Sequence, residues 1–334
     1  MDQYVVDPDF QHLGCIGHDR GRTATHTRVA NEITVEVPSE LDGARVDKVL
    51  ATLLEVSRAQ ARDLIDDGVS IDGVTARPAD RVTEGSTITT PVPRPAVELQ
   101  AEPVEFGVLY EDDTVIVVDK PVGVIVHPGA GRSLGTLAAG LLYRYPELEG
   151  VGSVDRWGLV HRLDKDTSGA LVVARTALGY EALVGQLKRR EITRVYTCLV
   201  DGRFEAPTGT IEAPIGRDPK RPMRRAVVPG GKSATTHYEV DREYPRFECS
   251  LLTVRLETGR THQIRVHLSA VDHPVIGDKT YGGRTTRVTS PRSFLHASRV
   301  EFSHPTTGER VRVDSPLAPD LRAVLDYLDQ HGTG

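Results

Sequence analysis

The sequence predicts an α+β protein, with a mixed, mostly antiparallel sheet in its main domain and a small α+β domain before it. Three observations support this fold class. Segments with strand character are short and bounded by turn signals, helical segments are few, and a proline-rich stretch at residues 91–95 separates a short module from the rest. At 334 residues, the chain is long enough for one small and one large domain.

The chain divides into four parts. Residues 1–31 are polar and without periodicity, and we expect a disordered extension there. Residues 32–93 form the small domain and residues 94–99 a stiff linker. Residues 100–328 then form the large domain.

The elements of the small domain follow from local patterns. Alternating apolar residues predict a strand at residues 33–37, and a single apolar face predicts a helix at residues 44–54. A second helix, at residues 57–68, begins at a Ser-x-x-Gln capping box and ends at a glycine. The Asp-Gly pair within residues 69–75 predicts a tight hairpin.

Four cations of the small domain lie in pairs on the two predicted helices. Arg45 and Lys48 share one helix face, and Arg58 and Arg62 share another. These side chains suit contacts with nucleic-acid phosphates. Solubilising surface charge is the alternative interpretation, since several aspartates lie nearby.

The large domain alternates short strands with one clear helix. Residues 108–118 predict a hairpin, and residues 178–190 predict a helix. Strands are predicted at residues 194–200, 235–241 and 248–257. We therefore expect helices packed against an antiparallel sheet.

The most informative stretch lies between two apolar runs, at residues 159–169. It reads Leu-Val-His-Arg-Leu-Asp-Lys-Asp-Thr-Ser-Gly, a charged loop between two segments that look like buried strands. Rigid strands that hold a polar loop are where enzymes place reactive groups. Asp164 is the first catalytic candidate, whereas Asp166 is expected only to cap the turn.

Two further segments carry groups suited to a reaction centre. Residues 258–268 read Thr-Gly-Arg-Thr-His-Gln-Ile-Arg-Val-His-Leu, in which Thr261 can cap a helix. Residues 189–196 read Arg-Arg-Glu-Ile-Thr-Arg-Val-Tyr and place Tyr196 in a strand. Taken alone, a tyrosine in a strand is usually a core residue.

The three segments resemble the conserved motifs of the RluA/RluD family of RNA pseudouridine synthases. Every fixed position of the family pattern His-Arg-Leu-Asp-x-x-Thr-Ser/Thr-Gly is met at residues 161–169. The small domain resembles an S4 RNA-binding domain. Within the family, the chain is most similar to the branch that modifies large-subunit ribosomal RNA.

The resemblance implies roles for individual residues. Asp164 aligns with the catalytic aspartate, and Arg265 with an arginine that pairs with it. A bidentate pair would lower the pKa of the aspartate and fix its rotamer. Tyr196 aligns with a tyrosine that packs on the target base and serves as the base for the C5 proton. Residues expected to line the substrate pocket are His161, Arg162, Ile264 and Leu295, although Ile264 and Leu295 are equally plausible as core.

The charge distribution favours a nucleic-acid partner despite the overall balance. The chain carries a net charge of −6, yet residues 186–232 hold eleven basic and five acidic side chains, a net charge of +6. One basic face on an acidic body is the expected result. In this region the residues expected to bind RNA are Lys188, Arg189, Arg190, Arg221, Arg224 and Arg225.

The sequence thus predicts isomerisation of specific uridines in large-subunit (23S) ribosomal RNA by a cytoplasmic enzyme. We expect no cofactor, no metal, no membrane association and a monomer. Transfer RNA is an alternative substrate. The rivals are a non-catalytic RNA-binding or ribosome-assembly protein, and a hydrolase that uses both aspartates or a metal held by His161, Asp164, His262 and His267.

Overall fold

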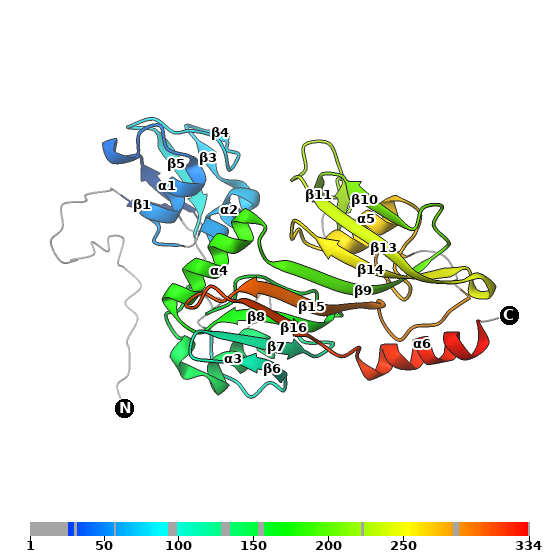
Figure 1. The fold of residues 1–334 in the computed structure, drawn as a ribbon. Helices are drawn as coiled ribbons and strands as arrows, with labels where there is room; N and C mark the ends of the chain where they lie inside the picture. Colours follow the sequence, from blue (N-terminus) through cyan, green and yellow to red (C-terminus); the bar gives the residue numbers. More distant parts are fainter. Residues whose placement is uncertain are drawn as a thin grey trace, which may run out of the picture. The chain divides into compact units, whose positions relative to one another are not determined.

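The structure is a computed structural model, and its description covers residues 26–29, 32–56, 58–92, 99–127, 134–152, 157–221, 224–282 and 287–332. The chain forms two compact units, residues 1–96 and 97–334, here named the N-terminal and C-terminal units (Figure 1). Residues 1–25 of the predicted extension and residues 94–98 of the predicted linker lie outside the described residues.

The N-terminal unit is a five-stranded antiparallel sheet with two helices. The strand order is β1-β2-β5-β3-β4. Its elements are β1 (His26–Val29), β2 (Glu32–Glu36), a 3-10 turn (Ser39–Leu41), α1 (Val46–Leu53), α2 (Arg58–Gly68), β3 (Ser70–Ile71), β4 (Val74–Thr75) and β5 (Thr87–Pro91). Both predicted helices and the hairpin at Asp72 are present, and Asp72 and Gly73 have the positive φ angles that the turn requires.

The N-terminal unit buries its core between the helices and one face of the sheet. Val49 and Leu50 of α1 are fully buried with Ile65 of α2 against Val35 and Ile88 of the strands. Residues 26–29, expected to belong to the disordered extension, form β1 and pair with β2. So short a segment has no apolar alternation that would predict a strand. It forms a strand by pairing with an edge of the sheet, which the sequence does not show.

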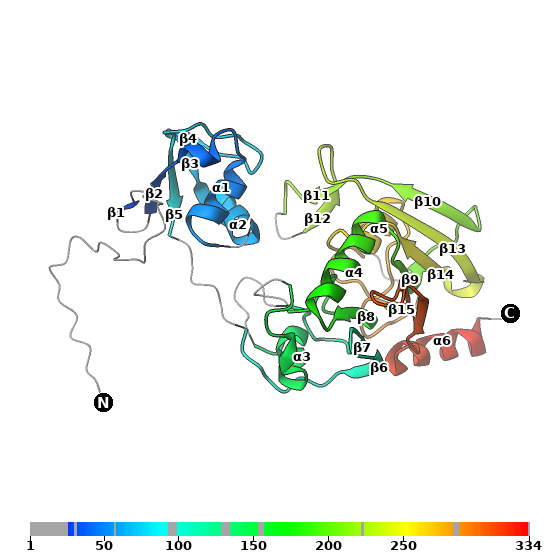
Figure 2. The ribbon, with the colours of Figure 1, turned by 60° about the vertical axis from the view of Figure 1, so that its left-hand side comes forward.

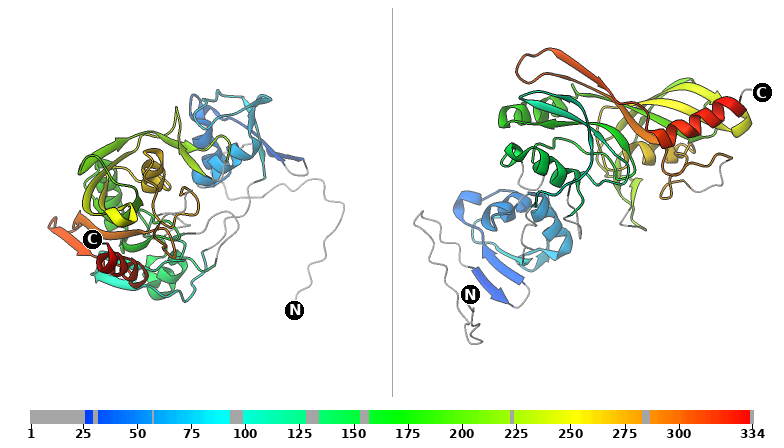
Figure 3. Two further views of the ribbon diagram at one scale, coloured as in Figure 1. Left: turned by 90° about the vertical axis from the view of Figure 1, so that its right-hand side faces the viewer. Right: turned by 90° about the horizontal axis from the view of Figure 1, so that it is seen from below.

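The C-terminal unit is built on one nine-stranded sheet. The strand order is β10-β13-β14-β9-β15-β8-β7-β6, with β16 paired to β15. The strands are β6 (Gly107–Glu111), β7 (Val115–Lys120), β8 (Ser168–Ala174), β9 (Thr193–Asp201), β10 (Thr208–Glu212), β13 (Thr235–Tyr244), β14 (Cys249–Leu256), β15 (Leu295–Ser303) and β16 (Arg310–Asp314). The β15–β8 pair is parallel and the others are antiparallel, so the predicted α+β class with a mostly antiparallel sheet is confirmed. Figure 3 shows the β15–β16 hairpin in orange.

Helices cover both faces of this sheet (Figures 1 and 2). They are α3 (Leu137–Arg144), α4 (Ala177–Arg189), α5 (Gln263–Ala270) and α6 (Pro319–His331), and two 3-10 turns lie at Pro146–Leu148 and Pro245–Phe247. On β8, Leu171 packs in the core cluster that contains residues of α3 and α5, whereas its neighbour Val172 packs with Leu183 of α4. Leu325 of α6 packs against Leu199 in a further cluster. Alternate residues of each strand thus serve opposite layers.

The loop at residues 159–167 enters β8 at a point where two strands approach closely. Gly169 has a φ of +115°, and a Cβ there would lie 2.3 Å from the carbonyl oxygen of Ala297 on β15. No other residue fits, which explains the glycine that closes the motif. The parallel pairing of β15 with β8 fixes the end of this loop.

A separate two-stranded hairpin lies outside the main sheet. Its strands are β11 (Ile215–Arg217) and β12 (Arg225–Val227), and we call residues 215–232 the basic hairpin. Ile215 packs with Val266 of α5 and with Tyr281, so the base of the hairpin is attached to α5.

Candidate active site

A pocket of about 600 Å³ lies in the C-terminal unit, among the motif loop, β9 and the start of α5. This volume is ordinary for a ligand cleft. It brings together segments that are far apart in the sequence. From the predicted set the lining includes His161, Arg162, Asp164, Lys188, Arg190, Tyr196, Ile264, Arg265 and Leu295.

Asp164 lies in the tight turn of the motif loop. The main-chain carbonyl of Asp164 accepts a hydrogen bond from the amide of Thr167, which closes the turn. Its side chain is 18% exposed, so the carboxylate borders the pocket without being sealed in the core. One carboxylate oxygen lies 3.0 Å from Nη1 of Arg265.

Arg265 reaches the pocket from α5 and is held by two carboxylates. Its Nε and Nη2 donate to Asp278 at 2.6 and 2.9 Å, while only Nη1 donates to Asp164. The prediction of a bidentate pair between Arg265 and Asp164 is therefore wrong, because the bidentate partner of the guanidinium is Asp278. Burial alone would lower the pKa of Arg265, but the two carboxylates raise it above its ordinary value.

Asp278 fixes this arginine from the opposite side. Its side chain is fully buried, and it also accepts hydrogen bonds from the amides of Thr280 and Tyr281. Burial would raise the pKa of this carboxyl group, but Arg265 and the amides lower it on balance. Arg265 therefore remains a fixed cation beside the carboxylate of Asp164.

Two buried basic side chains hold the main chain of the loop after Asp164. Nζ of Lys120 donates to the carbonyls of Pro121, Val124 and Lys165. Arg292 donates to the carbonyl of Asp166, which is the next residue along the loop. Consecutive carbonyls are thereby fixed, as a preorganised site requires.

Arg292 also connects the loop to the last helix. Its guanidinium donates to Oγ of Ser168 at 2.8 Å and forms a bidentate pair with Asp320 at the start of α6. The side chain of Arg292 is only 7% exposed. The position of the loop therefore depends on a contact with the C-terminal helix.

The stability of the protein is expected to depend on pH through Lys120. Burial, as the main cause, lowers the pKa of Lys120 from 10.5 to about 7. Between these values the unfolded chain binds a proton that the folded chain does not. As the pH increases through this range, the free energy of unfolding of the wild type should therefore rise relative to that of Lys120→Met, by up to about 1.4 kcal/mol per pH unit.

Urea denaturation of both proteins at pH 6.5, 8 and 9 measures this effect. The difference in free energy of unfolding should be constant below pH 7 and increase above it. A difference that stays constant from pH 6.5 to 9 would contradict the assignment of a titrating, buried Lys120.

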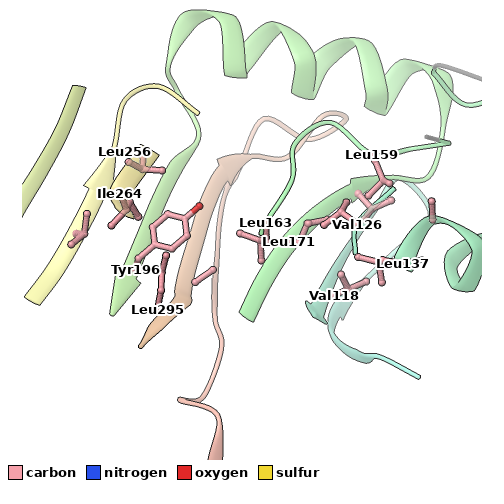
Figure 4. Close-up of a cluster of buried hydrophobic side chains, with 14 of the residues drawn as sticks. Val118, Val126, Leu137, Leu159, Leu163, Leu171, Tyr196, Leu256, Ile264 and Leu295 are labelled. Atoms are coloured by element: carbon pink, nitrogen blue, oxygen red, sulfur yellow. The ribbon is translucent and has the colours of Figure 1, made fainter. Parts of the chain in front are cut away.

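Tyr196 lies on β9 and forms an apolar wall of the pocket with Ile264 and Leu295 (Figure 4). The three side chains are 6%, 4% and 3% exposed, respectively. They thus belong both to the core and to the pocket lining. Burial raises the pKa of the Tyr196 hydroxyl above its ordinary value of 10, so the phenol is protonated at neutral pH.

The two residues that begin the motif have different environments. Nε2 of His161 accepts a hydrogen bond from the amide of Val172, which ties the loop to β8. Burial lowers the pKa of His161 to about 3, so it is neutral and suited to support. Arg162 is exposed, and its Nη1 lies 3.2 Å from Nε2 of His127 at the pocket.

The predicted RNA-binding cations do not form one cluster. Lys188 and Arg190 line the pocket, and Arg190 pairs with Glu257. Arg189 pairs with Glu191 on the surface. The remaining three cations of the C-terminal unit, Arg221, Arg224 and Arg225, lie on the basic hairpin and outside the pocket lining.

In the N-terminal unit, Arg45 and Arg62 share one structural partner. Both donate to the carboxylate of Asp47, whose side chain is almost completely buried. Their own side chains are 43% and 47% exposed, so each guanidinium also faces solvent. Lys48 is exposed, and the side chain of Arg58 lies outside the described set.

Within the described ranges, no group of three or more His, Cys, Asp or Glu side chains could hold a metal ion. His267, one of the four residues in the metal alternative, is fully buried. Its ring nitrogens bond Thr236 and the carbonyl of Ala213. Nor does any helix of the described part have the length and apolar character needed to cross a bilayer.

Three residues of the site were not among the predicted catalytic, pocket or RNA-binding residues. Arg194 lines the pocket two residues before Tyr196, on the same side of β9, a spacing that strand alternation could have indicated. No role was predicted for Asp278 from the sequence. His262, rather than Thr261, is the N-cap residue of α5, and it adopts a left-handed conformation that no sequence signal announced.

Comparison with known proteins matches both units. Residues 114–270 match the family model of RNA pseudouridylate synthases, and residues 44–88 match that of S4 domains. The chain is 41% identical over 305 residues to the RNA pseudouridine synthase YlyB of Bacillus subtilis, covering 90% of this chain and 100% of the relative. It is 42% identical over 311 residues to ribosomal large subunit pseudouridine synthase D of Pseudomonas aeruginosa, covering 88% and 95%.

A solved structure resembles about two thirds of this chain. Human RNA pseudouridylate synthase domain containing 1 matches with a TM-score of 0.53 at 30% identity, covering 68% of this chain and 94% of the human chain.

Proposed function

The chain belongs to the RNA pseudouridine synthase family, as its motifs predicted, and we propose that it converts specific uridines of large-subunit ribosomal RNA to pseudouridine, with Asp164 as the catalytic carboxylate. The observation that carries this proposal is the contact between the carboxylate of Asp164 and the guanidinium of Arg265, which borders the pocket and is anchored by Asp278. The substrate follows from relatives named ribosomal large subunit pseudouridine synthase D, at 42–43% identity.

The reaction breaks the bond from N1 of uracil to C1′ of ribose and joins C1′ to C5 of the same base. The proton on C5 leaves to solvent and N1 gains one, so no redox change occurs. Whether the carboxylate attacks C1′, adds to uracil or assists elimination from ribose, it must be ionised and face the nucleotide. Arg265 places a positive charge 3.0 Å from this carboxylate.

Because Asp164 lines the pocket, the glycosidic bond has to enter it, so the target uridine leaves the base stack. Tyr196, Ile264 and Leu295 offer an apolar wall on which uracil can pack. Contacts to the surrounding RNA backbone come from Lys188 and Arg190 at the pocket, from the basic hairpin and from the S4 domain. We propose that the protein acts as a monomer in the cytoplasm, where ribosomes assemble.

Tyr196 is the candidate acceptor for the C5 proton. Because its phenol is protonated at neutral pH, it can accept this proton only as its own proton leaves. Tyr196→Phe keeps the apolar wall and removes the hydroxyl, so single-turnover rates should fall by about 10²- to 10⁴-fold with RNA affinity unchanged. Filter binding and single-turnover assays separate these quantities, and a loss of less than threefold would restrict Tyr196 to packing.

Release of tritium from [5-³H]uridine-labelled RNA tests the proposed function. The purified wild-type protein is expected to release tritium from 23S ribosomal RNA, whereas Asp164→Ala should release none. Release from a transfer RNA pool alone would show that transfer RNA, and not ribosomal RNA, is the substrate. No release from either pool or from assembly precursors would favour a non-catalytic RNA-binding protein.

A further inference from the structure

His262 has a strained backbone at the edge of the pocket. It is the N-cap residue of α5, with φ 58° and ψ 21°, in the left-handed region. Residues with a Cβ rarely adopt this conformation, and surrounding structure must impose it. The imposed conformation places the imidazole in the pocket lining, three residues before Arg265.

One ring nitrogen of His262 has a protein partner. Its Nδ1 lies 2.8 Å from the hydroxyl of Tyr281. The same hydroxyl oxygen accepts a hydrogen bond of 2.9 Å from the backbone amide of Arg225, on β12 of the basic hairpin. Since that bond supplies the oxygen with a donor, the hydroxyl proton is free to point at Nδ1.

A hydroxyl of Tyr281 that donates to Nδ1 would select one tautomer of the ring. Burial lowers the pKa of His262 below its ordinary value, although the charge of Asp164 acts in the opposite direction, so the ring is neutral. A neutral imidazole that accepts at Nδ1 carries its proton on Nε2. No protein acceptor for this Nε2–H lies among the residues that the structure describes, and the residue is only partly buried.

We propose that His262 is a substrate-binding residue that donates a hydrogen bond from Nε2–H to an oxygen beside the glycosidic bond of the target uridine, and that Tyr281 is the positioning residue that fixes this tautomer. The proposal rests on the proposed function, because it assumes that Asp164 faces the same nucleotide. Three oxygens lie beside that bond, and the two outside the ribose ring, the 2′-hydroxyl and uracil O2, are the proposed acceptors. Tyr281 is itself held beneath the guanidinium of Arg265, whose Cζ lies 5.0 Å from the ring centre.

Two substitutions separate binding from backbone support. The amide of glutamine reaches the place of Nε2, whereas the shorter amide of asparagine reaches only that of Nδ1. Asparagine tolerates the left-handed conformation better than glutamine. A purely structural role therefore favours His262→Asn, and the proposed role favours His262→Gln.

Single-turnover rates on ribosomal RNA are expected to fall by about 10- to 100-fold for His262→Asn and by clearly less for His262→Gln. Equal losses, or a smaller loss for His262→Asn, would overturn the proposal. His331→Asn, on the exposed end of α6, is the matched control and should keep the wild-type rate. Thermal denaturation identifies any variant that fails to fold.

Modified substrates identify the accepting oxygen. If the bond is to ribose, the difference between wild type and His262→Asn should disappear with 2′-deoxyuridine at the target. If it is to uracil, the difference should disappear with 2-thiouridine. A difference that survives both substitutions would overturn the assignment of the contact.

The tautomer can be measured without substrate, so its outcome is independent of the proposed function. Long-range ¹H–¹⁵N spectra of histidine-labelled protein should show His262 protonated at Nε2 in the wild type. Tyr281→Phe should give a mixture of tautomers and a rate reduced by about three- to tenfold. Tyr143→Phe, whose ring is 59% exposed, is the control. A wild-type ring protonated at Nδ1 would overturn the role of Tyr281, even if the enzyme is active.

Discussion

Asp164→Ala is expected to abolish pseudouridine formation while RNA affinity stays within about twofold of the wild type. The carboxylate lies at the pocket beside Arg265, and none of the basic residues assigned to RNA contact depends on it. Removing a group on which the chemistry depends commonly costs about 10⁴-fold or more in rate. Tritium release under single-turnover conditions measures the loss, and filter binding measures the affinity.

Asp166→Asn is the matched control for this experiment. Its side chain is exposed, and the contact to Arg292 uses its main-chain carbonyl. Activity should remain within about threefold of the wild type, as expected for an exposed side chain. Turnover by Asp164→Ala above one per cent, or equal losses in the two variants, would contradict the assignment of Asp164.

Asp278→Asn is expected to weaken both the fold and the reaction. The substitution leaves the buried guanidinium of Arg265 without its bidentate partner. Loss of one partner of a buried ion pair costs about 3–5 kcal/mol in the free energy of unfolding. If the guanidinium shifts by about 1 Å, Asp164 shifts with it, and the rate is expected to fall by about 100-fold.

The contribution of Asp278 to the free energy of unfolding should depend on pH. The folded-state pKa of Asp278 is lowered from its ordinary value of 3.8. The stabilisation is therefore complete above about pH 4 and is lost as the pH falls through the folded-state pKa. Urea denaturation at pH 7 should show the full difference between wild type and Asp278→Asn, and a smaller difference at lower pH.

Glu248→Gln is the control for stability. Glu248 pairs with Arg287, and both side chains are about 60% exposed. Such surface pairs contribute about 0–1 kcal/mol. If Asp278→Asn were as mild as this control at pH 7, the buried anchor described here would be wrong.

The sequence was sufficient for the features that depend on local patterns. The predicted strand at residues 194–200 and the predicted helix at residues 178–190 correspond to β9 and α4 within one residue at each end. The motif at residues 161–169 predicted the reactive loop, because its charges lie between two apolar runs. These signals depend only on residues that are close in the sequence, so they can be interpreted without knowledge of the fold.

Features that depend on distant pairing were not predictable in the same way. Arg265 could be matched to a carboxylate, but the choice between Asp164 and Asp278 is decided by the turn at residues 276–281, which is fixed only in the folded state. The conformation of His262 likewise depends on Tyr281 and on the basic hairpin. Helix α6 carries an apolar face of Leu321, Val324, Leu325 and Leu328 that the sequence analysis did not use.

The most direct test of the central claim is a map of pseudouridine in the large ribosomal RNA. Primer extension after carbodiimide treatment would compare a strain lacking this gene with the same strain complemented by wild type, Asp164→Ala or Asp166→Asn. Stops that vanish on deletion, and return with wild type and Asp166→Asn but not with Asp164→Ala, are the expected result. Stops that persist in the deletion strain, or that return with Asp164→Ala, would contradict the account.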